Sequence, residues 1–332
     1  MLQTKDALFE CLAAQDGFIS GELLAERLGV SRSAVWKAVG ELRAEGCRIE
    51  AAQNRGYALR DPGSRLSAGR IQALLRGRAA DCRVLVERAV DSTNDELKRR
   101  AAAGCPTGTV LVAERQTGGK GRLGRSFYSP PRGGLYMSLL LRPALPASEC
   151  MAVTACTAVA VAAAAEQICG RRAEIKWVND IMMDGKKLCG ILTEGALSAE
   201  TGLFDYLVVG IGVNVASAGF PEELQEVATS MFGDVGNPPR DRVAAAILNL
   251  LFEKLETLPQ RTFMDEYRAR SCVVGREITM TDFSAGGEQV TARALDVDDD
   301  GGLVVETASG VRTLHSGEVS VRVRKSKEEQ SE

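Results

Sequence analysis

The sequence predicts a multidomain α+β protein with three folded units, and three observations indicate this class. Apolar residues recur at helical spacing within residues 1–62, and the turn-forming segment Asp-Pro-Gly-Ser at 61–64 follows them. Within residues 66–270, apolar strand-like runs and helical stretches occur without strict alternation, which favours a mixed sheet over repeated βαβ units. Residues 271–325 hold five short strand-like runs separated by Gly-rich or acidic turns, a spacing typical of a small β-barrel.

The first unit, residues 1–62, has the pattern of a winged helix-turn-helix. A short apolar helix ends at Gly29, and Ser31 is suited to cap the next helix. The inner face of that helix repeats at spacings of three and four: Val35, Ala38, Val39 and Leu42. Two short helices around a Gly-containing turn indicate a helix-turn-helix, and the turn at 54–56 between two strand-like runs indicates a wing.

Charge is segregated within this unit. Residues 31–60 carry six Lys or Arg against three Glu, a net +3, whereas residues 1–30 carry two against five, a net −3. The basic half covers the second helix and the wing, as phosphate contact requires. The predicted DNA contacts lie off the buried stripe: Arg32, Ser33, Trp36, Lys37 and Arg55. A winged helix used for protein contacts is the alternative. Because one such module binds weakly, we expect a homodimer on a two-part operator.

The composition of the chain limits the chemistry that the central unit, residues 66–270, can perform. The chain has a single histidine, His315, which argues against a Ser-His-Asp or Cys-His apparatus and against a His-based metal site. Chemistry in the central unit must therefore use Lys, Arg, backbone N–H groups and carboxylates. That set suits phosphoryl or adenylyl transfer, where positioning and charge stabilisation do most of the work.

Cysteine usage and hydropathy predict a cytoplasmic protein. The nine cysteines include no C-x-x-C pair, which argues against a disulfide framework and a zinc knuckle and favours reduced thiols. The N-terminus lacks the apolar core of a signal peptide. The most apolar run, residues 151–165, is shorter than the ~20 residues that span a bilayer, so we expect a buried helix and no membrane.

Residues 114–130, ERQTGGKGRLGRSFYSP, are predicted to close over an anionic ligand. Glycines at 118, 119, 121 and 124 allow close backbone approach, and the cations Lys120, Arg122 and Arg125 can neutralise phosphate or carboxylate. The spacing does not fit the Walker A loop. From composition alone, a flexible surface loop with solvated charges is an equal alternative.

Three further segments carry weaker signals. GIGVN at 210–214 lacks the third glycine of a dinucleotide fingerprint and is equally a tight strand-end turn. KWVNDIMMDGKKLCGILTE at 176–194 places Asp180 and Lys187 around a hairpin turn, where each alone is most simply a solvated charge. DSTNDEL at 91–97 alone is most simply a helix N-cap.

Together, these segments resemble the catalytic domain of biotin–protein ligases. The resemblance lies in Ser92-Thr93-Asn94, GKGRLGR, KWVND, KKLCGIL and GIGVN. The flanking units are similar to those of the bifunctional members, which ligate biotin and repress biotin genes. The resemblance implies a winged helix at 1–62, a class II synthetase-like ligase domain at 66–270, an SH3-like barrel at 271–325 and a disordered tail at 326–332.

The resemblance also implies a two-step, ATP-dependent reaction. The carboxylate of biotin attacks the α-phosphate of ATP, which gives biotinyl-5′-AMP and pyrophosphate, with Mg²⁺ as counter-ion and no protein metal site. A lysine of a biotin carboxyl carrier protein then attacks this anhydride. The implied catalytic residues are Lys187, Arg122 and Asp180. The implied biotin-binding residues are Ser92, Thr93, Asn94, Gln116, Gly119, Lys120, Gly121, Arg122, Lys187 and Gly190. The implied nucleotide-binding residues are Arg122, Arg125, Lys176, Asn179 and Asn214.

Three positions depart from the family pattern. Lys120 replaces an arginine and loses its bidentate fork, Phe127 stands where Trp is common, and Val178 replaces proline. The alternatives to a biotin–protein ligase are a lipoate–protein ligase and a non-enzymatic biotin-sensing repressor. Pyrophosphate release that depends on biotin separates an enzyme from a sensor.

Overall fold

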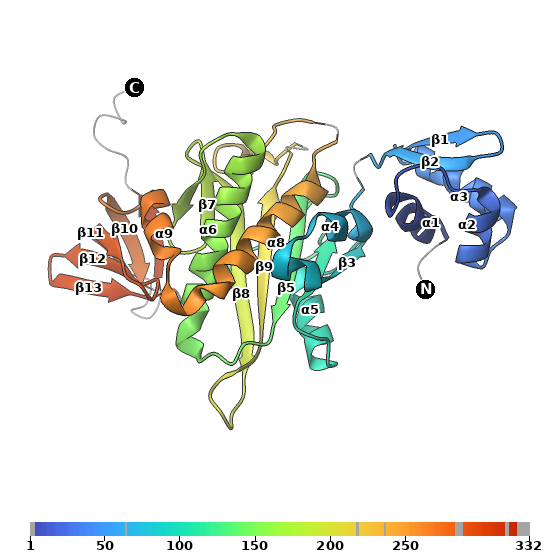
Figure 1. Cartoon of the computed structure of the whole chain (residues 1–332). Helices are drawn as coiled ribbons and strands as arrows, with labels where there is room; N and C mark the ends of the chain where they lie inside the picture. The colour runs from blue at the N-terminus through green and yellow to red at the C-terminus, as the bar shows by residue number, and fades with distance from the viewer. Residues whose placement is uncertain are drawn as a thin grey trace.

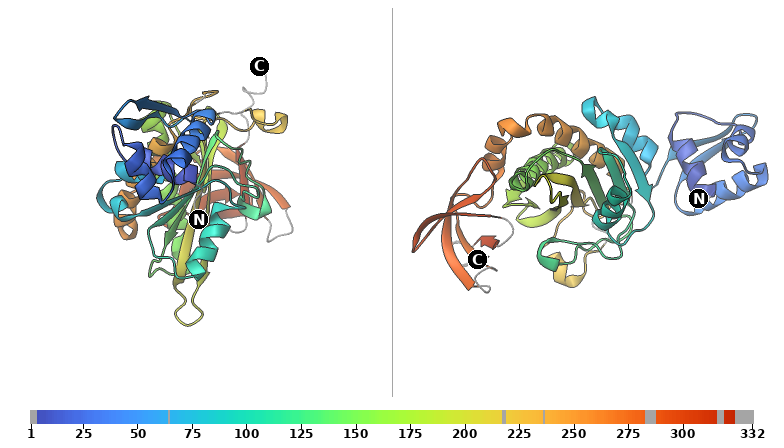
Figure 2. Two further views of the ribbon diagram at one scale, coloured as in Figure 1. Left: turned by 90° about the vertical axis from the view of Figure 1, so that its right-hand side faces the viewer. Right: turned by 90° about the horizontal axis from the view of Figure 1, so that it is seen from below.

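The computed structural model describes residues 4–63, 65–216, 219–235, 237–282, 288–315 and 319–323. Its helical N-terminal unit and its C-terminal sheet lie at opposite ends of a larger central domain (Figure 1; Figure 2, right). The N-terminal and C-terminal parts of the chain are therefore separated by the central domain. The tail predicted at 326–332 lies outside the described residues.

The N-terminal unit is a winged helix-turn-helix, as predicted. Its elements are α1 (Thr4–Ala13), α2 (Gly21–Leu28), α3 (Arg32–Ala44), β1 (Arg48–Ala52) and β2 (Gly56–Asp61). Gly29 ends α2 in the left-handed conformation with φ 63°, and the Ser31 hydroxyl caps α3 by accepting from the amide of Ala34 at 3.2 Å. The predicted stripe on α3 is buried against Leu8 and Leu12 of α1. The antiparallel pair β1–β2 forms the wing.

The central domain is built on a seven-stranded sheet in the order β3-β4-β5-β9-β8-β7-β6. Only the first pair in this order is parallel, so the sheet is mixed, as predicted. Its strands are β3 (Arg83–Glu87), β4 (Thr109–Ala113), β5 (Gly134–Leu141), β6 (Glu174–Lys176), β7 (Asp180–Met183), β8 (Lys186–Leu197) and β9 (Phe204–Asn214).

Helices cover both faces of this sheet. On one face, α6 (Cys150–Cys169) and α8 (Arg240–Glu256) pack together with α4 (Ala68–Leu74) and α9 (Met264–Arg270) over the main core. On the other face, α5 (Thr93–Ala102) packs against β4, β5 and β9. The remaining short helices are η1 (Gly77–Asp81), η2 (Arg122–Gly124), η3 (Ala147–Glu149), α7 (Glu222–Gln225) and η4 (Leu258–Gln260).

The most apolar run forms a core helix, as expected. The segment Ala147–Cys169 is long and apolar enough to cross a membrane by length and composition, but 67% of its most apolar window is buried inside the protein. Small alanine side chains let α6 approach both α8 and the sheet closely.

The C-terminal unit is a five-stranded antiparallel sheet in the order β13-β12-β11-β10-β14. Its strands are β10 (Glu277–Asp282), β11 (Glu288–Val297), β12 (Leu303–Thr307), β13 (Gly310–Leu314) and β14 (Val319–Val323). The five predicted strands are thus present. Arg268 of α9 holds this unit by donating to the carbonyl of Val297 at 2.8 Å.

A charged seam joins the winged helix to the central domain. Asp6 of α1 accepts from Arg65 at 2.6 Å and from Arg88 at 2.5 Å, and Glu45 pairs with both Arg65 and Lys5. Although burial acts to raise it, the pKa of Asp6 is held below its ordinary value by hydrogen bonds from these two arginines. The seam therefore fixes the winged helix beside the start of the central domain.

Candidate active site

The glycine-rich basic loop, residues 114–130, is anchored at its base to the start of α5. The side-chain oxygen of Gln116 accepts from the amide of Thr93 at 2.8 Å and from its hydroxyl at 3.1 Å, while its nitrogen donates to Ser129 at 2.9 Å. Ser129 was not predicted as a functional residue. It is a common polar residue beside a more obvious motif, so the sequence carries no separate signal for it.

Above this base the loop folds back on itself. Gly121 donates to the carbonyl of Arg125 at 2.7 Å, and Phe127 donates to that of Gly119 at 2.9 Å. A Cβ at Gly119 would lie 2.6 Å from both the carbonyl oxygen of Phe127 and the hydroxyl of Ser129. This position must be glycine for the loop to close in this way.

The floor of the site is a pair of glycines on neighbouring strands, because Gly190 of β8 lies opposite Gly212 of β9. The ring of Phe127 rests on this floor. A Cβ at Gly212 would lie 2.7 Å from the Phe127 ring, and one at Gly190 would lie 3.4 Å from it. The GIGVN and KKLCGIL motifs thus supply a flat surface that a ring can approach.

Polar side chains at the start of α5 line one end of the cavity. Both amide hydrogens of Asn94 are engaged, by the carbonyl of Leu192 at 3.1 Å and by Glu194 at 2.7 Å. Asn94 therefore offers a ligand only its oxygen. Ser138 of β5 lies 2.7 Å from that oxygen and 2.8 Å from the hydroxyl of Thr93. Ser138 was not predicted as a site residue, although a hydroxyl within the apolar run LYMSLLL is a usable signal.

Two cationic side chains, Lys187 and Arg122, also line the cavity. The ammonium of Lys187 lies 2.6 Å from a carboxylate oxygen of Asp180. The guanidinium of Arg122 donates to Asn179 at 3.1 Å, and Asn179 in turn donates to the carbonyl of Ile191 at 2.7 Å. Burial lowers the pKa of Arg122, but a guanidinium remains charged in proteins. Both cationic side chains therefore line the same cavity.

These groups share one cavity of about 160 Å³. Thirteen predicted site residues line it: Ser92, Thr93, Asn94, Gln116, Lys120, Gly121, Arg122, Arg125, Lys176, Asn179, Asp180, Lys187 and Gly190. The two others, Gly119 and Asn214, line an adjoining outer cleft of about 1050 Å³. Lys187, Asp180 and Lys176 line both spaces. Lys187 therefore lies at the junction between the cavity and the outer cleft.

Two hydrogen bonds to residues outside the sheet hold the segment at 177–179 in place. The indole of Trp177 donates to the carbonyl of Gly301 in the C-terminal unit at 2.9 Å. The buried hydroxyl of Tyr267 on α9 donates to the carbonyl of Val178 at 3.2 Å. No local pattern in the sequence predicts these long-range partners, because Gly301 lies 124 residues from Trp177.

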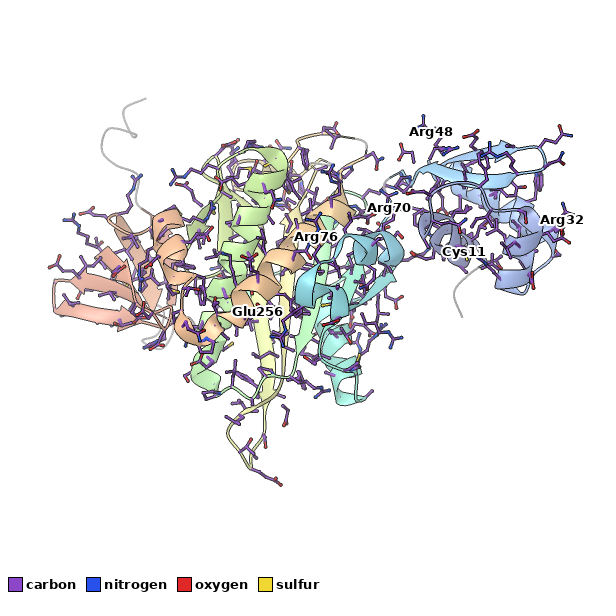
Figure 3. The ribbon with its side chains drawn as sticks, viewed as in Figure 1. Cys11, Arg32, Arg48, Arg70, Arg76 and Glu256 are labelled. Carbon is purple, nitrogen blue, oxygen red and sulfur yellow. The ribbon has the colours of Figure 1, made fainter. Side chains whose placement is uncertain are left out.

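The predicted DNA contacts lie on the winged helix. Arg32, Ser33, Trp36 and Lys37 are exposed on α3, and Trp36 is 72% exposed. Figure 3 shows Arg32 at the end of the molecule farthest from the central domain. On the wing, the guanidinium of Arg55 lies 4.2 Å from the ring centre of Phe18. Arg55 is therefore exposed, and a cation–π contact with Phe18 holds it in place.

Fold and site together define a ligase domain joined to a helix-turn-helix domain. The family model described as the biotin/lipoate A/B protein ligase family matches residues 86–214. A helix-turn-helix domain model matches residues 4–58, and a biotin protein ligase C-terminal domain model matches residues 273–322.

Relatives that match over nearly the whole chain identify the class of ligase more closely. The chain is 34% identical over 327 residues to the bifunctional ligase/repressor BirA of Bacillus subtilis, covering 96% of this chain and 98% of that protein. It is 28% identical to BirA of Escherichia coli, over 94% and 95% of the two chains. A biotin protein ligase from Aquifex aeolicus, solved with biotin and ATP, matches with a TM-score of 0.62 and 30% identity over 73% of this chain and 99% of that one. The protein belongs to the family of bifunctional biotin ligase/repressors.

Proposed function

We propose that this protein makes biotinyl-5′-AMP from biotin and ATP, transfers biotin to a lysine of a biotin carboxyl carrier protein, and represses biotin genes through its winged helix. The observation that carries the ligase part is that Lys187 and Arg122 line one cavity, and that Lys187 also lines the adjoining outer cleft. Family membership supports both parts.

Each end of the cavity suits one end of biotin. The ureido group has two donors and one acceptor, so it fits neutral polar partners such as Ser92, Asn94 and Gln116. The carboxylate then points toward Lys187 and Arg122. The flat glycine floor under Phe127 leaves room for the apolar chain between them.

The first step brings two anions together, so their repulsion must be cancelled. Lys187 and Arg122 neutralise the biotin carboxylate and the α-phosphate as the new bond forms and pyrophosphate leaves. Asp180 positions Lys187 through the 2.6 Å contact. Arg125, Lys176, Asn179 and Asn214 are proposed to hold the nucleotide. In the described part of the chain, no group of three or more His, Cys, Asp or Glu side chains could hold a metal ion. Mg²⁺ is proposed to enter with ATP and to offset the charge of the leaving pyrophosphate.

The second step takes place at the outer cleft. The mixed anhydride hydrolyses readily, so a loop that shields it from water protects it until the carrier lysine arrives. That lysine attacks the acyl carbon, an amide forms, and AMP leaves.

We also propose the domain bounds, the folds of two domains, a cytoplasmic location and a homodimer. The proposed domains are residues 1–62, 66–270 and 271–325, the last an SH3-like barrel and the middle one class II synthetase-like. All nine cysteines are free, which suits a reducing cytoplasm. A homodimer would present two winged helices to a two-part operator.

Transfer of labelled biotin to a purified carrier domain, with ATP and Mg²⁺ and with lipoate as a control, tests the ligase. We expect transfer of biotin and not of lipoate. A folded protein that releases no pyrophosphate when biotin is added would instead be a sensor without enzyme activity. Transfer of lipoate in place of biotin would reassign the substrate.

A further inference from the structure

We propose that Lys120 and Asp95 form a clasp that holds the basic loop closed over the cavity, and that this clasp sets how long the adenylate stays bound. The first half stands on geometry alone, and the second half rests on the proposed function. Lys120 is a loop residue, and Asp95 lies in the first turn of α5 on the body of the domain.

The two charged groups are in direct contact. The ammonium of Lys120 lies 2.6 Å from one carboxylate oxygen of Asp95, and the ammonium of Lys98 lies 2.9 Å from the other. Burial acts to raise the pKa of Asp95, yet hydrogen bonds from the two lysines keep it below its ordinary value. The first turn of a helix also favours a negative charge. Asp95 is therefore ionised and placed to attract the loop.

The clasp is one end of a longer chain of contacts. Lys98 also pairs with Glu194 of β8 at 2.8 Å, and Glu194 accepts from Asn94 at 2.7 Å. Asn94 lines the polar end of the cavity. The loop is thus tied, through three ion pairs and one hydrogen bond, to the residues proposed to hold biotin.

This arrangement gives a physical reason for lysine at position 120, where the family pattern has arginine. A lysine ammonium is a point charge that needs one carboxylate oxygen and leaves the other for Lys98. A bidentate guanidinium would compete with Lys98 for both oxygens. Lys120 is therefore matched to its neighbours and is not merely a weaker arginine.

The position of the clasp along the loop explains what it controls. Gly118 is bonded to the carbonyl of Asp91 at 2.7 Å, and the ring of Phe127 rests on the glycine floor, so both ends of the loop are fastened. Between them, Lys120 holds to Asp95 and Arg122 reaches Asn179. When the contact between Lys120 and Asp95 breaks, residues 120–126, which include Arg122, are free to move away from the cavity.

The expected effect is moderate. The side chain of Lys120 is 51% exposed and that of Asp95 is 18% exposed, and pairs of this kind shift an equilibrium by about two- to five-fold. Added salt should weaken the contact further, because exposed charges are screened.

The test uses the full-length variants Asp95→Asn and Lys120→Met, with Arg100→Met as the matched control. Arg100 lies on the same helix and pairs with Glu96 and Glu87, away from the loop. Hydrogen–deuterium exchange of the ligand-free protein reports opening of residues 118–127. A chase experiment then measures how fast preformed biotinyl-adenylate leaves.

We expect both clasp variants to raise loop exchange and adenylate release by about two- to five-fold, and the double variant to do no more than either single one. Arg100→Met should leave both at the wild-type values. Loop exchange equal to wild type in both clasp variants would overturn the clasp. Faster exchange with unchanged release would overturn its role in retention. A wild-type protein that forms no adenylate would sink the proposed function and the retention role together, while the exchange measurement still decides the clasp.

Discussion

The ammonium of Lys187 lies 2.6 Å from a carboxylate oxygen of Asp180, and both side chains line the cavity of about 160 Å³ as well as the adjoining outer cleft. The pair lies on adjacent strands, Asp180 at the start of β7 and Lys187 near the start of β8. Its members are seven residues apart, so the hairpin turn between them creates the contact.

We predict that Lys187→Ala folds normally but slows adenylate formation by on the order of 100-fold, because one of two charges that offset the anionic repulsion is lost. Asp180→Asn should slow it less, since Lys187 keeps its charge and loses only its partner. Biotin-dependent pyrophosphate release measures both, and a thermal melt checks folding. A wild-type rate in Lys187→Ala would remove this residue from the chemistry.

A second prediction concerns the glycine floor. Gly212→Ala should weaken biotin binding and lower stability by about 1–3 kcal/mol, because its Cβ would lie 2.7 Å from the Phe127 ring and force it to move. Gly118→Ala is the matched control, since its Cβ would meet nothing closer than 3.5 Å. Biotin titration and denaturant unfolding of both variants give the comparison. Equal behaviour of the two variants would mean that the ring moves aside at no cost.

The sequence predicted much of the fold for a local reason. Caps, turns and apolar spacing are properties of neighbouring residues, so Ser31, Gly29 and the stripe on α3 could be interpreted without tertiary information. The candidate site came mainly from the resemblance. Taken one at a time, Asp180 and Lys187 looked like solvated turn charges.

What the sequence could not predict depends on distant parts of the chain. The hydrogen bond from Trp177 to Gly301 spans 124 residues, and the ion pair between Arg65 and Asp6 spans 59. No periodicity encodes such pairs. The contact between Lys120 and Asp95 belongs to the same class, since the sequence showed only that a family arginine was missing.

A third prediction follows from the buried carboxyl group of Asp241, which helps to fix the segment after the winged helix. It accepts from the amide of Ser67 at 3.2 Å and from Arg70 at 3.0 Å, and its side chain is 8% exposed. Burial raises the pKa of Asp241 to about 6 from an ordinary value of 3.8. The folded state therefore binds a proton more tightly than the unfolded state, and this contribution to stability is lost as pH rises from about 4 to about 6.

The size of this effect is about 3 kcal/mol, since each pKa unit corresponds to about 1.4 kcal/mol. We expect wild type to lose that much unfolding free energy relative to Asp241→Asn between pH 4 and pH 7. The exposed Asp265→Asn serves as control. Urea unfolding across this range makes the measurement, and a constant difference between wild type and Asp241→Asn would show that Asp241 does not titrate in this window.

The last prediction separates the two proposed activities. Arg32 and Trp36 are exposed on the face of α3 away from its buried stripe, and the central cavity is built from other elements. Arg32→Ala and Trp36→Ala should therefore weaken operator binding by about 1–3 kcal/mol for a lost base contact, and leave biotin transfer unchanged. Fluorescence titration of operator DNA at two salt concentrations also tells phosphate contacts from base contacts, because losing a phosphate contact lowers the salt dependence by about one unit. If both variants bind operator as wild type does, α3 does not read DNA, and the winged helix then serves the alternative role of contacting another protein.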